Sequence, residues 1–417
     1  MAASKFQPRS LPLEGGGCVR ADAGHGGGEN CGRHLPQKRF EQMKNIVILG
    51  STGTIGENTL EIIRRTKGRF RVLGLACRNR KNILAGQIRE FRPAYVYLEK
   101  EDPQFEKNFP ATRFLHGDTG MEKMAVLEDA DVVICAVPGI RTLKAVVSAV
   151  KRGRTVGLAT KEILVVAGHI VRPLARKHGA CLLPIDSEHN AIFQALNGVK
   201  KQEVEKIYLT ASGGPFRGRP AARRVTVKDV LKHPVWKMGK KITVDSATMM
   251  NKAFEIIEAH YLFDIPAEKI DVLIHPEAVV HGMVEMKDGT VKAVLSVPDM
   301  KFPINFVLDY PRRRESALQK LKFERIKKLT LMPADRSSAW FSLAVQAIRE
   351  KGSFPVVLNA ANEEAVDLFL KGKIEFGEIL KVVQEVLCRH RLKKTVSVDD
   401  ILRIHERARQ QVRELVG

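Results

Sequence analysis

The fold is indicated first by the stretch NIVILGSTGTIG, residues 45–56. The apolar run 45–49 predicts a buried strand, and the apolar residues beyond Gly56 recur at helical spacing, which predicts a helix. The glycines between them place backbone N–H groups and the positive end of the helix where a pyrophosphate can sit. A tight turn whose glycines serve packing alone is the alternative interpretation.

Strands and helices alternate over the first half of the chain. Helical spans separate short apolar runs at 72–77, 95–98, 132–137, 155–159 and 180–185. Continuous apolar strands separated by helices are typical of a parallel sheet covered on both faces. The sequence therefore predicts a Rossmann-like, doubly wound α/β domain.

Beyond residue 187 the pattern changes. Strands are expected at 206–211, 272–274 and 291–297, the last alternating and half exposed, which predicts an α+β unit. Segment 310–330 is rich in Arg and Lys and is typical of a connector, and from residue 338 the apolar periodicity is helical. The predicted division is a disordered tail at 1–43, a dinucleotide-binding domain at 44–186, an α+β domain at 187–310, a linker at 311–336 and a C-terminal helical bundle domain at 337–417.

The first 43 residues are set apart by glycine triplets at 15–17 and 26–28 and by very few apolar residues. Such a segment cannot pack a core, which predicts disorder. It lacks the apolar centre of a secretory signal, and Glu14, Asp22 and Glu29 argue against an organelle transit peptide. A mistaken start site upstream of Met43 explains the segment equally well.

The composition excludes several classes of protein. The 417 residues are 44% hydrophobic and 28% charged, which is ordinary for a globular protein and unlike a disordered chain. No run approaches the roughly 18 apolar residues of a membrane span, so we expect no membrane partner. The six cysteines are scattered without a Cys-x-x-Cys pair, which argues against a disulfide framework or a thiolate zinc site and favours the cytoplasm.

The charge balance favours an anionic partner. The chain has 69 Lys and Arg against 47 Asp and Glu, a formal net charge of +22, which suits nucleic acid, acidic lipid or phosphorylated small molecules. A nucleic-acid-binding protein is therefore the hypothesis from another class. Aromatic residues make up only 6% of the chain, and neither a zinc knuckle nor an RNP-type motif is present, so we expect no nucleic acid partner.

Basic residues follow the second predicted strand. A dinucleotide enzyme that prefers NAD usually has an acidic residue there for the ribose hydroxyls, whereas this chain has Arg78, Asn79, Arg80 and Lys81. These cationic side chains favour NADP. The alternative is a solvated run of charge.

Two carboxylates follow the strand predicted at 180–185. Asp186 and Glu188 are two residues apart, so in an extended conformation both point to one side. Glu255 is the candidate third ligand, and helical spacing puts Asn251 and Lys252 near its face. Three oxygen ligands suit Mg²⁺ or Mn²⁺ with water completing the shell. The alternatives are an Asp-x-Glu without a function and a surface helix pair of Lys252 and Glu255.

Three further segments combine hydroxyl, amide and cationic groups: ASGGPF at 211–216, HPVW at 233–236 and DSAT at 245–248. Small hydroxyl residues beside glycine can present several donors together to a phosphate. An ordinary turn explains any single one of them. Trp236 suits either a lid over a ligand or a buried structural position.

Taken in order, these segments resemble the 1-deoxy-D-xylulose 5-phosphate reductoisomerase family from about residue 44 to the carboxy terminus. A different two-domain NADP reductase is not expected to share all of the matching strings in this order. The strings are ILGSTGTIG at 48–56, LPIDSEHNAIFQAL at 183–196, LTASGGPFR at 209–217, HPVWKMGKKITVDSATMMNKAFEIIEAHYLF at 233–263, IHPEAVVHGMVEMKDGTV at 274–291, PDMKFPI at 298–304 and VLNAANEEAV at 357–366.

The resemblance implies NADPH and Mg²⁺, Mn²⁺ or Co²⁺ as cofactors, a small phosphorylated substrate and a homodimer. It makes 44–186 the NADP-binding domain and 187–310 the catalytic and dimerisation domain. Catalytic roles would fall on Lys161, Asp186, Glu188 and Glu255, the last three as metal ligands. Substrate-binding roles would fall on Ser187, Ser212, His233, Trp236, Ser246, Asn251, Lys252 and Glu255, with Trp236 and Met238 in a flap. Cofactor-binding roles would fall on Gly50, Thr52, Gly53, Thr54, Ile55, Arg78, Asn79, Arg80, Thr160, Lys161, Glu162 and Gly239.

The reaction that the resemblance implies is the isomerisation of 1-deoxy-D-xylulose 5-phosphate, by retro-aldol cleavage and re-addition, to an aldehyde that NADPH reduces. The product is 2-C-methyl-D-erythritol 4-phosphate, in the non-mevalonate isoprenoid pathway. The metal would act as a Lewis acid on the vicinal oxygens of the substrate. The remote phosphate would supply binding energy for closure of the lid.

Some positions depart from the family pattern. Thr160 replaces the Asn of Leu-Ala-Asn-Lys-Glu, Val235 replaces the Asn of His-Pro-Asn-Trp, and residues 139–143 read GIRTL where the family usually has GAAGL. The element 78–80 also aligns only loosely. These changes concern the cofactor site and the flap, so we expect altered kinetic constants rather than a lost activity.

The first rival among enzymes is an NADP-dependent semialdehyde or homoserine dehydrogenase, whose opening glycine turn looks similar. A semialdehyde dehydrogenase needs a cysteine nucleophile with a histidine base. Cys135 lies in an apolar run, and no local signature supports it as a nucleophile.

Overall fold

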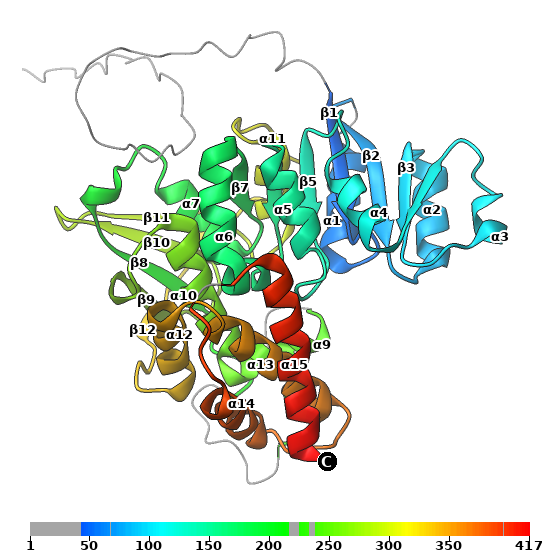
Figure 1. Cartoon of the computed structure of the whole chain (residues 1–417). Helices are drawn as coiled ribbons and strands as arrows, with labels where there is room; N and C mark the ends of the chain where they lie inside the picture. The colour runs from blue at the N-terminus through cyan, green and yellow to red at the C-terminus, as the bar shows by residue number, and fades with distance from the viewer. Residues whose placement is uncertain (1–42, 67, 217–224, 233–237, 395) are drawn as a thin grey trace, which may run out of the picture.

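The computed structural model describes residues 43–66, 68–216, 225–232, 238–394 and 396–417 (Figure 1). Apart from Met43, the predicted disordered tail lies outside the described residues. The described part of the chain contains a parallel sheet, a mixed sheet and a group of C-terminal helices. None of the helices described there is long and apolar enough to cross a membrane.

The first sheet is parallel throughout, and its order is β4-β3-β2-β1-β5-β6-β7. The chain reverses its direction of winding at β1, which pairs with β2 on one side and β5 on the other, so the glycine turn lies at the switch point. The predicted doubly wound fold is confirmed. The strands are β1 (Lys44–Leu49), β2 (Phe70–Cys77), β3 (Tyr95–Leu98), β4 (Arg113–His116), β5 (Val132–Cys135), β6 (Thr155–Leu158) and β7 (Cys181–Pro184).

Helices cover both faces of this sheet. Ile46 and Ile48 of β1 point to one apolar cluster, and Val47 and Leu49 point to another, as alternation along a strand requires. The first cluster includes residues of α1 (Thr54–Arg65), α2 (Lys81–Phe91) and α11 (Lys301–Asp309). The second includes residues of α4 (Gly117–Ala125), α5 (Leu143–Lys151) and α6 (Glu162–His178). The short helix α3 (Pro103–Glu106) precedes β4. Helix α11 thus returns from much later in the chain to pack beside α1.

The second sheet has the order β11-β10-β8-β9-β12. Strands β8 and β9 are parallel and the other pairs are antiparallel. Helix α7 (Ser187–Ala195) packs on β10 and β11 and also contacts β7, so it joins the two sheets. The strands are β8 (Val204–Ala211), β9 (Ile270–Ile274), β10 (Val280–Met286), β11 (Val291–Leu295) and β12 (Met332–Pro333).

The alternation predicted for 291–297 is wrong. Val291, Lys292 and Ala293 are all exposed, and the residues that follow are intermediate. The reason is position, because β11 is the edge strand of its sheet, in the hairpin with β10 at the margin of the molecule (Figure 1).

The C-terminal helices pack against the helices that carry the site. Helix α13 (Phe354–Leu370) is buried along most of its length and contacts α6, α9 (Lys240–Thr248), α14 (Glu378–Arg389) and α15 (Val398–Val416). Helix α12 (Ala339–Glu350) packs on α10 (Met250–Phe263). The remaining elements are the short helix α8 (Val227–Val230) and 3₁₀ turns at Lys201–Glu203, Ala267–Lys269 and Phe323–Arg325.

Candidate active site

The turn after β1 lines a groove of about 1000 Å³. Gly50 has a φ of +96°, and a Cβ there would lie 2.8 Å from the carbonyl oxygen of Ala136, so only glycine allows this close approach to the end of β5. Helix α1 begins after Gly53 without a side-chain cap, which leaves its first N–H groups for another acceptor. These features fit the pyrophosphate of a dinucleotide.

Of the residues singled out after β2, Arg78, Asn79 and Arg80 lie in the same groove, together with Thr52 and Gly53, whereas Lys81 pairs with Asp102. Arg80 donates from Nη1 to the carbonyl oxygen of Thr52 at 2.9 Å and so supports the turn. Arg78 donates from Nε to Oε2 of Glu99 at 2.9 Å. The structure therefore brings Arg78, Asn79 and Arg80 beside the glycine turn, as the sequence predicts.

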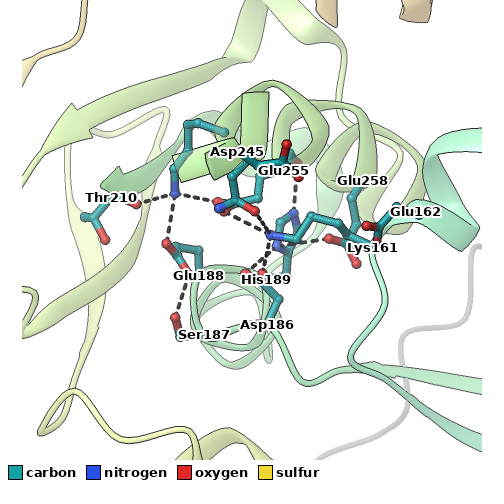
Figure 2. A network of polar contacts seen from close by, with 12 residues as sticks. Lys161, Glu162, Asp186, Ser187, Glu188, His189, Thr210, Asp245, Glu255 and Glu258 are labelled. Carbon is teal, nitrogen blue, oxygen red and sulfur yellow. Dashed lines mark hydrogen bonds and ion pairs between the residues drawn. The ribbon is translucent and has the colours of Figure 1, made fainter. Parts of the chain in front are cut away.

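Three carboxylates meet where the two sheets approach each other (Figure 2). Asp186 follows β7, Glu188 is in the first turn of α7, and Glu255 comes from α10. Each offers one oxygen, and these oxygens lie within 4.8 Å of one another. Glu255 is 1% exposed and Lys252 is 5% exposed, so the alternative of a surface pair is wrong.

Two lysines lie among these oxygens. Lys161 Nζ is 2.6 Å from Oδ2 of Asp186 and 3.1 Å from Oε1 of Glu255. Lys252 Nζ is 2.8 Å from Oε1 of Glu188 and 2.5 Å from Oε2 of Glu255, and it also donates to the carbonyl oxygen of Thr210. Burial alone would lower the pKa of Lys161, but the charges of Asp186 and Glu255 outweigh it and raise that pKa well above its ordinary value. Both amines are therefore charged.

The electrostatics of Glu255 fit a divalent cation. Burial, followed by the negative charge of Glu188, raises the pKa of Glu255 above its ordinary value, despite the opposing effect of Lys161 and Lys252. A set made entirely of carboxylate oxygens is what hard cations such as Mg²⁺ and Mn²⁺ prefer. The positive charges of the two lysines therefore do not fully balance the negative charges of the three carboxylates.

A second acidic cluster, which the sequence reasoning missed, lies behind the first. His189 Nδ1 is 3.1 Å from Oδ1 of Asp186 and 3.4 Å from Oε2 of Glu258, and His189 Nε2 is 2.8 Å from the carbonyl oxygen of Glu255. Both His189 and Glu258 are buried. Because this histidine already uses both ring nitrogens and is not among the described residues that line the cavity beside the first cluster, it supports the ligand residues rather than binding an ion itself.

The first cluster faces a cavity of about 210 Å³. Its wall includes Thr54 and Ile55 from the cofactor turn, which places that turn and the carboxylates around one space. Gly214, with a φ of +65°, brings the loop after β8 close to Ser246, because a Cβ there would lie 3.1 Å from the carbonyl oxygen of Ser246. The cavity is also lined by the predicted residues Lys161, Ser187, Ser212, Gly239, Asn251 and Lys252, together with Met238.

Other predicted residues lie elsewhere. Thr160 is buried and donates from Oγ1 to the carbonyl oxygen of Val137 at 2.8 Å, and Glu162 accepts from Lys241 Nζ at 2.7 Å. Neither is among the described residues that line the two cavities. His233 and Trp236 lie outside the described residues. Burial raises the pKa of Cys135 to about 11, which agrees with its exclusion as a nucleophile.

A doubly wound domain with an open glycine turn, beside a buried carboxylate and lysine cluster, defines a dinucleotide-dependent α/β enzyme with a cation site. Residues 46–168 match the sequence profile of 1-deoxy-D-xylulose 5-phosphate reductoisomerase. Residues 182–263 and 295–411 match two profiles of C-terminal domains of the same enzyme. The chain belongs to the 1-deoxy-D-xylulose 5-phosphate reductoisomerase family.

Individual relatives agree with this membership. The chain is 44% identical over 380 residues to the 1-deoxy-D-xylulose 5-phosphate reductoisomerase of Thermodesulfovibrio yellowstonii, covering 90% of this chain and 100% of the relative. It is 45% identical over 377 residues to that of Thermoanaerobacter pseudethanolicus, covering 89% and 98%.

Solved structures agree as well. A DOX-P reductoisomerase in complex with NADPH, fosmidomycin and magnesium is similar with a TM-score of 0.82 at 35% identity, covering 90% of this chain and 98% of that one. The enzyme from Zymomonas mobilis in complex with NADPH is similar with a TM-score of 0.82 at 36% identity, covering 90% and 99%.

Proposed function

We propose that this chain catalyses the NADPH- and divalent-metal-dependent isomerisation and reduction of 1-deoxy-D-xylulose 5-phosphate to 2-C-methyl-D-erythritol 4-phosphate, a step of isoprenoid synthesis. One observation carries the proposal. The three carboxylates, two lysines and the cofactor turn surround a single cavity, and their polar groups converge on it as they do in a ligand site. Relatives with this name, and solved structures that hold NADPH and magnesium, support it.

The cofactor would lie in the groove above β1 and β2. Its pyrophosphate would take the N–H groups of Thr52, Thr54 and Ile55, and Arg78, Asn79 and Arg80 would lie beside its adenosine ribose. Gly53 lines the groove, and the next two residues, Thr54 and Ile55, line the reaction cavity, so the groove and the cavity meet at the start of α1. A nicotinamide held there would be next to the substrate.

The acidic cluster would hold the metal through Asp186, Glu188 and Glu255. A bound divalent cation supplies Lewis-acid polarisation of substrate oxygens. Lys161, which also donates to Oδ1 of Asn251 at 2.8 Å, would hold a charged ammonium beside the reacting carbons. Its N–H groups would orient the substrate oxygens and favour the negative charge that develops on them.

The substrate phosphate would be bound by further residues that line the cavity. Ser212 and Ser246 are brought together by the turn at Gly214, and Asn251 and Lys252 come from the first turn of α10. Hydroxyl, amide and ammonium donors suit phosphate oxygens. Binding the remote phosphate here would position the carbon skeleton against the carboxylates.

The test is NADPH oxidation, followed by its absorbance, with 1-deoxy-D-xylulose 5-phosphate and Mg²⁺, Mn²⁺ or Co²⁺, with and without EDTA. We expect a metal-dependent rate, and we expect Glu255→Gln to lower kcat/KM by roughly a hundredfold or more, since one electrostatic contact to the transition state is lost. Glu268→Gln is the control, because it is the same substitution at an exposed residue. A folded wild-type protein that oxidises no NADPH with any of these metals would contradict the proposal.

We further propose that the chain is a homodimer that pairs through β11. This edge strand is exposed, with Val291 52% exposed, and exposed strand edges pair readily with other strands. Wild type should sediment at twice the chain mass of 46.5 kDa, whereas Val291→Lys should shift it towards the monomer. Ile83→Lys, at an exposed apolar residue of α2, should leave the dimer intact. A monomeric wild type would refute the dimer, and a dimeric Val291→Lys would refute this interface.

We also propose that the enzyme works in the cytoplasm. Among the described residues, no disulfide joins two cysteines. Unbridged thiols are usual in reducing compartments, which supports the proposal.

A further inference from the structure

An ion-pair bridge of three residues crosses the cofactor groove. Glu99 follows β3 and accepts from Arg78, at the end of β2, and from Arg141, in the loop after β5. In the order β3-β2-β1-β5, Arg141 therefore reaches past the ends of β1 and β2 to meet Glu99. All three residues line the groove that contains the glycine turn.

The bridge holds two guanidinium groups on one carboxylate. Arg78 uses Nε on Oε2 at 2.9 Å, and Arg141 uses Nη1 on Oε1 at 2.7 Å. A guanidinium has five N–H donors, so each arginine keeps further donors, and the two side chains are 62% and 52% exposed. The three residues carry a net positive charge beside the cofactor turn.

The neighbouring cations of the groove are engaged differently. Arg80 donates to the carbonyl oxygen of Thr52, and Lys144 Nζ is 3.0 Å from Oδ1 of Asp399. Arg409 is held by Glu363 and Glu364. Asp118 and Glu122 add negative charge to the lining. Arg78 and Arg141 are thus the two guanidinium groups that one carboxylate holds together in an exposed position.

We infer that Arg141 is a specificity-determining residue, which together with Arg78 binds the 2′-phosphate on the adenosine ribose of NADPH. Paired guanidinium groups match phosphate oxygens through two parallel hydrogen bonds each, which an NADH ribose hydroxyl cannot use. Glu99 holds both arginines at a fixed separation before the cofactor binds. The inference rests on the proposed function, because it takes this groove to be the NADPH site.

The test measures binding rather than turnover. Isothermal titration of the full chain compares adenosine 2′,5′-bisphosphate with adenosine 5′-monophosphate, which lacks the 2′-phosphate. Arg141→Gln should lower the affinity for the bisphosphate by about tenfold or more, as expected for a lost charge-assisted hydrogen bond. Its affinity for the monophosphate should change by less than about twofold. Arg141→Lys, which keeps the charge without the planar fork, should fall between Arg141→Gln and wild type.

Lys144→Gln is the matched control, because it removes a cation from the same groove that is already paired with Asp399. It should change the affinity for the bisphosphate by less than about twofold. If Lys144→Gln lost as much affinity for the bisphosphate as Arg141→Gln, general attraction by positive charge would explain the binding, and the inference would be overturned. The inference would also be overturned if Arg141→Gln bound the bisphosphate with unchanged affinity, or if its affinity for both nucleotides fell equally.

The same titration separates this inference from the proposed function. If Arg141→Gln prefers the bisphosphate as strongly as wild type does, the role inferred for Arg141 is wrong and the proposed function stands. If wild type binds neither nucleotide, the groove is not the cofactor site and both proposals fail. Circular dichroism of each variant checks folding, which the exposure of Arg141 should leave intact.

Discussion

His189 supports the acidic cluster without reaching its cavity. Its Nε2 faces the carbonyl oxygen of Glu255 and its Nδ1 faces Asp186, so both ring nitrogens act as donors to ligand residues. One imidazole thereby fixes the end of β7 relative to α10. Partners of this kind set the orientation of the oxygens that a metal ion meets.

Replacing His189 should weaken metal binding more than it weakens folding. In His189→Asn the carboxylate of Asp186 loses its hydrogen bond, and we expect the affinity for Mn²⁺, measured by titration, to fall about tenfold to a hundredfold. His260→Asn is the matched control, since His260 is on α10, the helix of Glu255, but bonds the carbonyl oxygen of Ile265. Unchanged Mn²⁺ affinity in His189→Asn would show that the histidine only fills space.

The sequence predicts the members of this site better than its supports. Asp186 and Glu188 are neighbours in one string, as are Lys252 and Glu255 in another, so short-range spacing was enough to make them candidates. His189 follows Asp186 by three residues, and Glu258 follows Glu255 by three residues. In a helix, this spacing puts the two members of each pair on the same face. That signal was available but is common in helices. The partnership of Glu162 with Lys241 joins α6 to α9 and has no local signal at all.

Among the elements, the strands buried on both faces of the first sheet were predictable, as was the edge strand β11, whereas β4, β10 and β12 were missed. The apolar runs that predict β2, β3, β5, β6 and β7 lie at these strands to within about two residues. Strand β4 was missed because it begins with the exposed Arg113 at the edge of the sheet, and β10 was missed because polar residues such as His281 and Glu285 interrupt it. Strand β12 has only two residues, which is too short for any pattern.

Helix α15 is capped by Ser397, the residue that precedes its first turn. Ser397 Oγ accepts from the backbone N–H of Asp400 at 3.1 Å, and a carboxylate oxygen of Asp400 accepts from the backbone N–H of Ser397 at 3.0 Å. Ser397→Ala should therefore lower the free energy of unfolding by about 1 kcal/mol in urea titrations. Ser397→Asp should retain most of the stability, because its carboxylate can still cap the helix. Equal losses in both variants would exclude capping as the cause.

At the scale of the whole molecule, buried charges join the three parts of the chain. Lys241 of α9 is 2.7 Å from Oε1 of Glu162 in α6 and 2.9 Å from Oδ2 of Asp245. Asn362 of α13 donates to Oδ1 of the same aspartate at 2.9 Å. The predicted C-terminal helices are therefore bonded to the helices that shape the site.

Acid should loosen the contact between α13 and α15. Burial alone would raise the pKa of Glu363, but the hydrogen bond from His405 and the charges of Lys241 and Arg409 bring it below its ordinary value. A lowered carboxylate pKa stabilises the fold above the unfolded value of about 4.3, and that stability is lost as the pH falls through the folded value. Glu363→Gln should therefore lose less stability than wild type between about pH 5 and pH 3 in urea titrations.

Glu268→Gln, at an exposed glutamate, should follow the wild-type pH profile in the same titrations. Parallel profiles for wild type and Glu363→Gln would mean that other groups govern the acid response.

The return of α11 to the first sheet has a consequence for protein engineering. Ile304, Val307 and Leu308 share a core with Ile46 and Ile48 of β1, although more than 250 residues separate them along the chain. A cofactor domain exchanged between two relatives as one uninterrupted piece would leave this core with mismatched halves. A working chimera has to carry residues 301–309 together with the amino-terminal strands, so two separate segments of the gene would have to be exchanged rather than one.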